Sequence, residues 1–416
     1  MCRSCFVSSV LVLVFSASVF GEDWTQWRGP NNDGKSRETG LLASWSAEGP
    51  KLLWSCENMG FGFSNIAVVG DRIYSMGDHG NDCNLYALDK KDGNVIWKTR
   101  VGRSGGTTNH KGPRCTPAVD GNRIFAIGQF GDLVCADVKT GKLIWSINVK
   151  QKLGGRVMST WDCSMSPIID GNQVVLPIGG EQGTVIAFDK NSDELKILWQ
   201  TKQITDAAAY TSLVPVEIGG VKQYILRTAN NLYGISAAEG KTLWHAEAEG
   251  RTAVCSDPVY WKEGDDTCYI LTSCAYGIGA FGYKVTGKGA DFKVEQIYEA
   301  PSLTSHHGGM VEVNGHFYLL TNFAMVCVDP KNGQTLWNNK SVGKGSIFAV
   351  DGKLILRKET GDGDIAMIVA SPTEYKELGR FPQPDRTDKN SWTYPTVVDG
   401  RLYIRDQGLL LCYEVK

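Results

Sequence analysis

Short runs of alternating apolar and polar residues, each interrupted by a glycine-containing pair such as Asp-Gly or Asn-Gly, recur along the whole chain. A typical copy is AVDGNRIFAI at 118–127. The alternation predicts β-strands, and glycine accepts the positive φ that a tight hairpin turn requires. The turn glycines of the eight copies are Gly70, Gly121, Gly171, Gly220, Gly264, Gly315, Gly352 and Gly400, spaced 37 to 51 residues apart. Each copy therefore predicts one two-stranded hairpin.

A second recurring unit follows most of these hairpins. It consists of an acidic residue, a turn ending in glycine, three residues and a tryptophan, as in DVKTGKLIWSI at 137–147. This unit adds two strands to each period. Four short strands repeated eight times, with no intervening helical pattern of 10 to 15 residues, indicate a β-propeller built from four-stranded antiparallel blades with strands A to D.

The two ends of the chain predict how the ring closes. PKLLWSCEN at 50–58 reads as a lone D strand, whereas residues 397–416 supply only A, B and C strands. We therefore predict an all-β fold, an eight-bladed β-propeller closed by the N-terminal strand joining the C-terminal blade, which removes an exposed sheet edge. The propeller is expected to be a single domain over 51–416, preceded by an extended N-terminal arm over 22–50.

The recurring tryptophans occupy one slot of the D strand, where a large flat side chain can fill the wedge between adjacent blades. Blades five and seven place Tyr298 and Phe381 near this slot instead. The tryptophans with this expected structural role are Trp54, Trp97, Trp145, Trp199, Trp244 and Trp337.

A small residue recurs in the C strand, and in three blades it is a cysteine. The slot contains Ala87, Cys135, Ala187, Gly234, Cys327 and Cys412. We interpret these three cysteines as small buried residues. Disulfides stay open for Cys56, Cys83, Cys115, Cys163, Cys255, Cys268 and Cys274, because no spacing fixes a pairing.

Residues 1–21 contain one charge, Arg3, followed by an apolar run from Phe6 to Phe20. This pattern predicts a secretory signal peptide and hence a periplasmic or secreted protein, with a retained membrane anchor as the alternative. No later segment is long and apolar enough to predict a transmembrane helix. The formal net charge of −2 and the lack of a basic run argue against nucleic-acid and anionic-membrane partners.

The repeat ALDKKDGNVIW (87–97) and the opening WTQWRGPNNDGKS (24–36) resemble the pyrroloquinoline quinone (PQQ)-like propellers. That family includes quinoprotein alcohol dehydrogenases and the BamB-type scaffold of the outer-membrane β-barrel assembly machinery. For a dehydrogenase, the resemblance would imply PQQ, a calcium ion held by acidic and amide side chains, an aspartate base and a disulfide between adjacent cysteines. This chain has no Cys-Cys pair, and none of its motifs matches the calcium set or the base. No catalytic residue is therefore assigned.

Candidate binding residues fall in long D–A and B–C connections, which share one face of a propeller. Loops of this kind on a rigid scaffold commonly carry binding sites. Residues near the starts of the innermost A strands should rim a central funnel. The candidates are His110, Arg114, Trp161, Asp162, Tyr210, Asp257, His306, His307 and Trp392. An equally simple role for Arg114 and Asp162 is to bridge neighbouring blades.

No metal site is predicted. Neighbouring side chains on a strand point in opposite directions, so we interpret His306 and His307 as a polar loop pair of which only one faces the channel. Zinc would need ligands from other loops, which sequence does not place. Glu359, Asp362 and Asp364 in ETGDGD could bind calcium, but a solvated turn is the favoured interpretation.

Two functional hypotheses follow from these features. The favoured one is a non-catalytic exported scaffold in the cell envelope that binds a protein, a peptide or a polysaccharide. The alternative is a PQQ- and calcium-dependent oxidoreductase acting on alcohols or sugars. No cofactor is firmly supported by the residues. A deep pocket with convergent polar groups would favour the enzyme, and a broad apolar patch at a rim would favour the scaffold.

Overall fold

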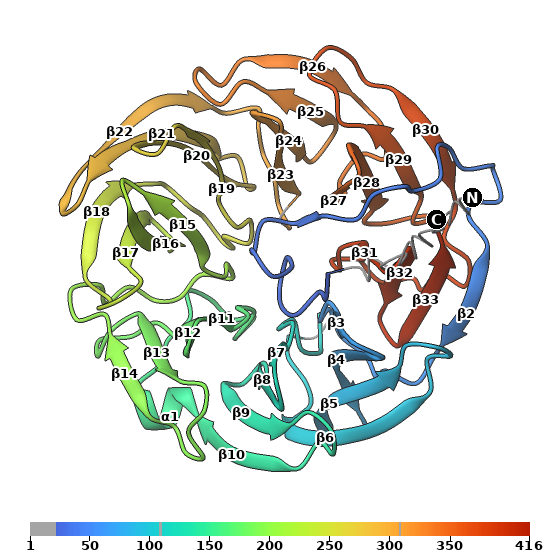
Figure 1. The fold of residues 1–416 in the computed structure, drawn as a ribbon, viewed down its shortest axis with the longest axis horizontal. Helices are drawn as coiled ribbons and strands as arrows, with labels where there is room; N and C mark the ends of the chain where they lie inside the picture. The colour runs from blue at the N-terminus through green and yellow to red at the C-terminus, as the bar shows by residue number, and fades with distance from the viewer. Residues whose placement is uncertain (1–21, 108–109, 308) are drawn as a thin grey trace, which may run out of the picture.

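The computed structural model describes residues 22–107, 110–307 and 309–416, so the expected signal peptide lies outside the described residues. Eight separate sheets surround a common centre (Figure 1). The prediction of an all-β, eight-bladed propeller of four-stranded blades is confirmed. Across the described residues, no helix has the length and apolar character to cross a membrane.

The blades follow one another in chain order, each with its A strand at the centre of the ring and its D strand at the rim (Figure 1). Blades one to three are β3 (Ala67–Val69), β4 (Arg72–His79), β5 (Asp82–Asp89), β6 (Val95–Arg103); β7 (Ala118–Asp120), β8 (Arg123–Ile127), β9 (Asp132–Asp137), β10 (Leu143–Asn148); and β11 (Ile168–Asp170), β12 (Gln173–Pro177), β13 (Val185–Asp189), β14 (Ile197–Gln200). Blades four and five are β15 (Val214–Ile218), β16 (Val221–Arg227), β17 (Asn231–Ser236), β18 (Thr242–Glu247); and β19 (Val259–Glu263), β20 (Thr267–Cys274), β21 (Gly279–Lys288), β22 (Asp291–Ala300). Blades six and seven are β23 (Met310–Val313), β24 (His316–Leu320), β25 (Met325–Val328), β26 (Thr335–Asn339); and β27 (Gly345–Val350), β28 (Lys353–Lys358), β29 (Ile365–Val369), β30 (Glu377–Phe381).

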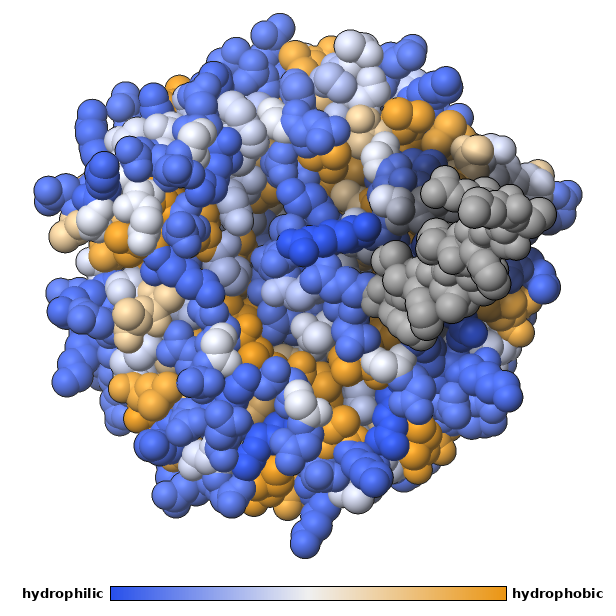
Figure 2. Space-filling model, in the orientation of Figure 1, coloured by the Kyte–Doolittle hydropathy of each residue, from blue (hydrophilic) through white to orange (hydrophobic). Residues whose placement is uncertain are grey.

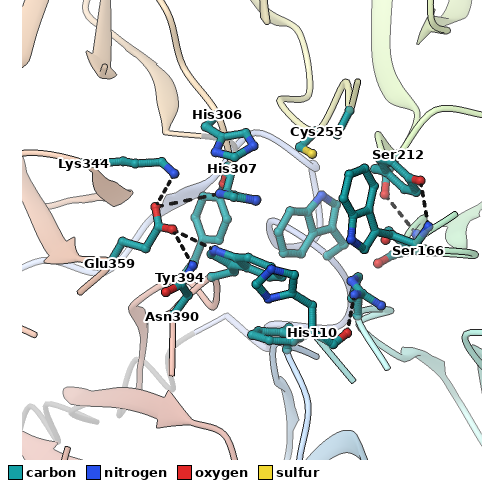
Figure 3. Close-up of a pocket in the computed structure, with 18 of the residues that line it drawn as sticks. His110, Ser166, Ser212, Cys255, His306, His307, Lys344, Glu359, Asn390 and Tyr394 are labelled. Carbon is teal, nitrogen blue, oxygen red and sulfur yellow. Dashed lines mark hydrogen bonds and ion pairs between the residues drawn. The ribbon is translucent and has the colours of Figure 1, made fainter. Parts of the chain in front are cut away.

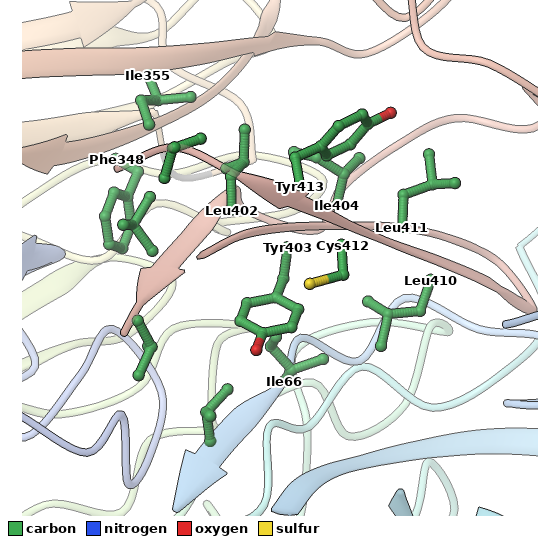
Figure 4. Close-up of a cluster of buried hydrophobic side chains, with 14 of the residues drawn as sticks. Ile66, Phe348, Ile355, Leu402, Tyr403, Ile404, Leu410, Leu411, Cys412 and Tyr413 are labelled. Atoms are coloured by element: carbon green, nitrogen blue, oxygen red, sulfur yellow. The ribbon is translucent and has the colours of Figure 1, made fainter. Parts of the chain in front are cut away.

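The eighth blade joins the two ends of the chain. Its strands are β31 (Thr396–Val398), β32 (Arg401–Asp406), β33 (Leu409–Glu414) and β2 (Leu52–Cys56). The N-terminal strand β2 pairs antiparallel with β33, with Trp54 opposite Cys412. The predicted closure is therefore confirmed. Buried side chains from blade eight, blade seven and the start of blade one form one apolar cluster around this junction (Figure 4).

The segment before β2 begins at the centre of the ring, crosses to the rim and then runs along the outer edge to β2 (Figure 1). Its residues hydrogen bond to six blades. The contacts join Trp24 to Val68, Thr25 to Val119, Gln26 to Ile169, Arg28 to Met310, Leu41 to Asp351, and Glu38 to Gly400. The short strand β1 (Lys35–Ser36) pairs parallel with β27 and makes blade seven five-stranded. Sequence reasoning expected an extended arm here but did not foresee that it fills the centre.

Strand register explains the small C-strand slot. The slot residue lies directly opposite the D-strand aromatic residue in the pairs Ala87–Trp97, Cys135–Trp145, Ala187–Trp199, Gly234–Trp244, Gly282–Tyr298, Cys327–Trp337 and Cys412–Trp54. A methyl group built onto Gly234 would lie only 2.0 Å from Nε1 of Trp244. The indole ring therefore lies directly over Gly234 and leaves no room for a large side chain in the slot. Cysteine fits because it is small and apolar. All ten cysteines of the described residues are free thiols.

Several aromatic rings of the D strands also touch the next blade. A methyl group on Gly141, in the C–D turn of blade two, would lie 2.6 Å from a ring carbon of Trp97 in blade one. The same contact joins Gly93 to Trp54, Gly240 to Trp199, and Gly333 to Tyr298. The turn glycine therefore leaves room for the ring of the preceding blade.

Blade seven departs from the expected pattern. The residue opposite the C-strand slot is Gly379, which pairs with Met367, and not Phe381. Trp45 of the N-terminal segment lies against Gly379, where an added methyl group would meet its backbone at 2.6 Å. Phe381 packs edge-on against the Trp45 ring at 5.5 Å. In blade seven, Trp45 of the N-terminal segment thus packs against the D strand, whereas in the other blades the D strand itself supplies the large aromatic ring.

The face of the molecule in Figure 2 is mostly hydrophilic, and its hydrophobic residues form separate small groups. On the described residues, exposed large apolar side chains fall mainly on outer D strands and on connections of the D–A and B–C face. Those on outer strands are Leu52, Val95, Ile96, Leu143, Ile197, Leu198 and Leu336. Those on the connections are Phe61, Tyr276 and Phe323.

Replacing Gly141 with alanine tests the packing between blades. Gly121 is a matched control because its φ is also positive but an added methyl group would meet nothing within 4 Å. Gly141→Ala should lower the free energy of unfolding by about 1–3 kcal/mol more than Gly121→Ala, because overpacking adds to backbone strain. Urea denaturation followed by circular dichroism measures both. Equal effects would mean that the contact with Trp97 does not restrict this position.

Candidate functional site

A pocket of about 960 Å³, including its open mouth, lies on the propeller axis (Figure 3). Each of the eight D–A connections contributes at least one residue to the wall of the pocket. From these connections come Phe63, His110, Arg114, Trp161, Ser164, Ser166, Tyr210, Ser212, Ala253, Cys255, His306, His307, Lys344, Asn390, Trp392 and Tyr394. Two B–C residues, Tyr276 and Glu359, and Trp27 of the N-terminal segment complete the lining.

Seven of the nine candidates from sequence meet in this pocket. They are His110, Arg114, Trp161, Tyr210, His306, His307 and Trp392. Their common location follows from the topology, since each precedes an A strand and all A strands surround the axis. What these residues bind stays a prediction.

Asp162 and Asp257 do not line the pocket. Asp162 forms an ion pair with Lys150 of the short helix α1 (Val149–Leu153), within the same D–A connection. Asp162 therefore does not bridge blades through this pair. The Arg114 guanidinium donates to the carbonyl oxygens of Gly112 and His110, at 3.1 and 2.6 Å, and stabilises its own loop.

Asp257 holds the pocket residue Trp27 in place. Its Oδ2 accepts a 2.5 Å hydrogen bond from Nε1 of Trp27, and its Oδ1 accepts one of 2.7 Å from the backbone of Ser212. Burial raises the pKa of Asp257, and the nearby Arg28 charge partly offsets that effect. Trp27 packs edge-on against Tyr394 at 5.0 Å. The N-terminal segment thus supplies a tryptophan to a site made otherwise by the blades.

Aromatic rings stack along one part of the wall. Trp392 stacks on Phe63 with centroids 4.2 Å apart and on His307 with centroids 4.3 Å apart. His110 contacts the same indole at 4.8 Å. Flat apolar surface next to imidazole nitrogens suits ligands that combine an apolar body with a polar group.

Glu359 is buried, contrary to the expected solvated turn. Only 4% of the residue is exposed. Its Oε1 accepts hydrogen bonds from Asn390 at 3.0 Å and from Trp392 at 3.1 Å, and its Oε2 pairs with Nζ of Lys344 at 2.9 Å. Burial alone would raise the pKa of Glu359, but the contacts with His307 and Lys344 lower it to about 2. Glu359 is therefore ionised at neutral pH.

Both His306 and His307 line the pocket, so the expectation that only one faces the channel is wrong. Strand β23 begins at Met310, and the alternation of a strand does not apply to the loop before it. Burial lowers the pKa of His306 to about 2, assisted by His307, and burial also lowers the pKa of His307. Both imidazoles are neutral at pH 7.

Cys255 of a different connection lies beside the two histidines (Figure 3). One potential ligand atom each from Cys255, His306 and His307 lie within 4.8 Å of one another. Burial raises the pKa of the Cys255 thiol to about 12. Sequence analysis predicted no metal site because it could not bring Cys255 next to the histidines. Cys255 lies about fifty residues before His306 along the chain.

The calcium ion of the alternative hypothesis does not fit these residues. Calcium takes six to eight oxygen ligands. Glu359 is the only carboxylate among the described pocket residues, and N–H donors engage both of its oxygens. Asp362 and Asp364, considered with it from sequence, do not line the pocket. The pocket residues therefore do not offer the oxygen ligands that a calcium ion requires.

Sequence reasoning missed several pocket residues for different reasons. Trp27 belongs to a segment with no repeat pattern, and Lys344 precedes an A strand without an aromatic or histidine signal. Ser166 and Ser212 occupy equivalent positions before their A strands, and a search for polar residues at this position in every blade would have found them.

Comparison with known proteins supports the family. The family model described as "Outer membrane protein assembly factor BamB" matches residues 84–339, more than half of the chain. A protein of that description from Yersinia pestis is 24% identical over 324 residues, 75% of each chain. Its counterpart from Nitrosomonas eutropha is 26% identical over 152 residues, 36% of this chain and 31% of the relative.

Solved structures share the fold. A quinohemoprotein alcohol dehydrogenase from Pseudomonas putida HK5 superposes with a TM-score of 0.67 at 13% identity, over 95% of this chain and 80% of the other. BamB from Moraxella catarrhalis superposes with a TM-score of 0.58 at 14% identity, over 84% and 96%. Similarity at this level of identity shows the architecture and does not assign an activity.

Removing the Glu359 carboxylate tests the polar wall. Glu359→Ala should lower the free energy of unfolding by about 2–3 kcal/mol, because Lys344, Asn390 and Trp392 lose their acceptor. The expected loss is below that of a fully buried pair because 31% of the Lys344 side chain is exposed. Urea denaturation at pH 7 measures the change. Glu249→Ala, in an exposed pair with Arg251, should leave stability unchanged, and a similar result for both variants would contradict the prediction.

Proposed function

The chain belongs to the PQQ-like, BamB-like β-propeller family, and from this premise we propose that it is an exported, non-catalytic binding protein of the cell envelope. Its ligand in this proposal is a segment of an envelope protein. The observation that carries the proposal is the aromatic pocket on the propeller axis, to which all eight D–A connections contribute. An apolar or aromatic side chain of the partner enters this pocket.

Exposed aromatic residues around the pocket face support a protein partner. Phe323 is 78% exposed in the B–C connection of blade six, and Phe61 is 66% exposed in the D–A connection before blade one. Both connections belong to the face that carries the pocket. Exposed phenylalanines next to a partly apolar pocket are typical of recognition surfaces, in which a buried anchor supplies most of the binding energy.

The names of the relatives point in the same direction. Both curated relatives are outer membrane protein assembly factors, a role that concerns other proteins of the envelope. A polysaccharide could also stack on Trp161 or Trp392, but the family match favours a polypeptide. The favoured ligand is therefore an extended protein segment.

Site-specific photo-crosslinking tests which face meets the partner. A photoreactive phenylalanine analogue replaces Phe323 or Phe61 in cells that make the full chain. Both positions should crosslink to envelope proteins. The matched control is Asp71, whose side chain is 95% exposed in an A–B turn on the opposite face.

The pocket itself is tested by adding Trp392→Ala to the Phe323 crosslinking variant. The crosslink should weaken several-fold, because the stacked wall loses its central ring. Crosslinks of equal yield from Asp71 and Phe323, or a yield unaffected by Trp392→Ala, would contradict the proposal.

Calorimetric titration with PQQ, with and without calcium, tests the enzymatic alternative. We expect no calcium-dependent binding, because the one pocket carboxylate of the described residues is engaged by N–H donors. Tight one-to-one binding that requires calcium would overturn the non-catalytic assignment.

A further inference from the structure

The Cys255, His306 and His307 side chains come from two different D–A connections and meet in the central pocket (Figure 3). We propose that these three residues form a binding site for a single zinc-class transition-metal ion, with its fourth position open to the pocket. This inference does not depend on the proposed partner, which rests on the aromatic residues and the family.

The donor set is the first argument. Thiolate and imidazole are the ligands that zinc prefers, and three protein ligands with one open position are typical of sites that bind a water molecule or a further ligand. The three potential ligand atoms lie within 4.8 Å of one another. In a tetrahedral zinc site the ligand atoms are roughly 3.5 Å apart, so side-chain shifts on the order of 1 Å complete the geometry.

The surroundings of the two histidines are the second argument. Nε2 of His306 lies 2.7 Å from the Tyr276 hydroxyl, and Nδ1 of His307 lies 3.9 Å from Oε2 of Glu359. Metal-binding histidines commonly direct one ring nitrogen to a hydroxyl or carboxylate partner, which orients the other nitrogen toward the metal. Tyr276 is in place for this orienting role at His306. Nδ1 of His307 is buried without a hydrogen-bond partner, and Glu359 is the carboxylate nearest to it among the described pocket residues.

The backbone conformation of Tyr276 and the charges near the cluster are compatible with a metal site. Tyr276 has a φ of +62°, a left-handed conformation that is uncommon for a tyrosine and is retained where surrounding structure fixes it. Lys344 contributes a positive charge near the cluster, but the Glu359 carboxylate pairs with it at 2.9 Å. On binding, Cys255 releases its thiol proton to solvent, so its thiolate neutralises part of the charge of the ion.

Cobalt(II) is the probe because it occupies zinc sites and reports its ligands by absorption. The full-length exported chain is prepared without a histidine tag, treated with EDTA and titrated with Co²⁺. We expect one equivalent to bind, with the visible bands of a four-coordinate ion and a thiolate-to-cobalt charge-transfer band in the near ultraviolet. One equivalent of Zn²⁺ should displace the cobalt and raise the melting temperature.

Variants assign the ligands. Cys255→Ser should abolish the charge-transfer band, and His307→Asn should abolish one-to-one binding. Tyr276→Phe retains every ligand but loses the hydroxyl at His306, and it should weaken Co²⁺ binding by about tenfold. Circular dichroism and the melting temperature of each metal-free variant verify that it is folded.

Two matched controls lie close to the cluster. Cys274 is a buried thiol that contacts the carbonyl oxygens of Arg251 and Ala253, and serine can donate to the same oxygens. His110 lines the same pocket but lies outside the cluster. Cys274→Ser and His110→Asn should both keep the wild-type cobalt spectrum.

The cobalt spectra of the wild-type protein and of Cys255→Ser can each overturn the proposal. No stoichiometric binding, binding without a charge-transfer band, or a band that survives Cys255→Ser would each refute it. Binding of copper(II) with no binding of zinc or cobalt would overturn the choice of ion. None of these outcomes affects the crosslinking test, which distinguishes failure of this proposal from failure of the proposed function.

Discussion

The hydrogen-bonded pairing of β2 with β33 is the constraint on which the rest of the structure depends. It joins residues near the N-terminus to the last strand of the chain and turns a row of eight sheets into a ring. A buried arginine reinforces the same junction, because Arg405 of blade eight donates to the carbonyl oxygen of Ser64 and to the Ser75 hydroxyl near blade one. Without this closure, two blades would expose an unpaired edge or face to water.

Closure also creates the axis on which the pocket lies. Once the ring is complete, every D–A connection begins at the rim and ends at the centre, so residues before the A strands converge. The N-terminal segment then occupies the centre and is held by several blades, with Trp27 fixed to Asp257. The pocket is thus lined by residues of the repeats and by one residue, Trp27, of the segment that does not repeat.

The electrostatics of the pocket follow from burial. His306 and His307 are neutral because desolvation lowers the pKa of each, whereas Glu359 stays ionised because cationic and N–H groups surround it. The result is a partly apolar cavity with uncharged nitrogen donors on one side. Such a cavity is suited to an aromatic side chain and to a thiophilic metal ion, and it is poorly suited to calcium, which requires several oxygen ligands.

The sequence by itself determined the repeating architecture. Hairpin glycines such as Gly121, the D-strand tryptophans and the missing D strand at the C-terminus are local signals, and together they predicted the blade count and the closure. Sequence also identified seven pocket residues, because a position just before an A strand implies a position near the axis. The tertiary structure alone decided that Glu359 is buried, that Trp27 lines the pocket and that Cys255 meets His306 and His307. These facts depend on contacts between residues far apart in the chain and on loop conformations that have no periodic pattern, and neither is encoded in any short stretch of sequence.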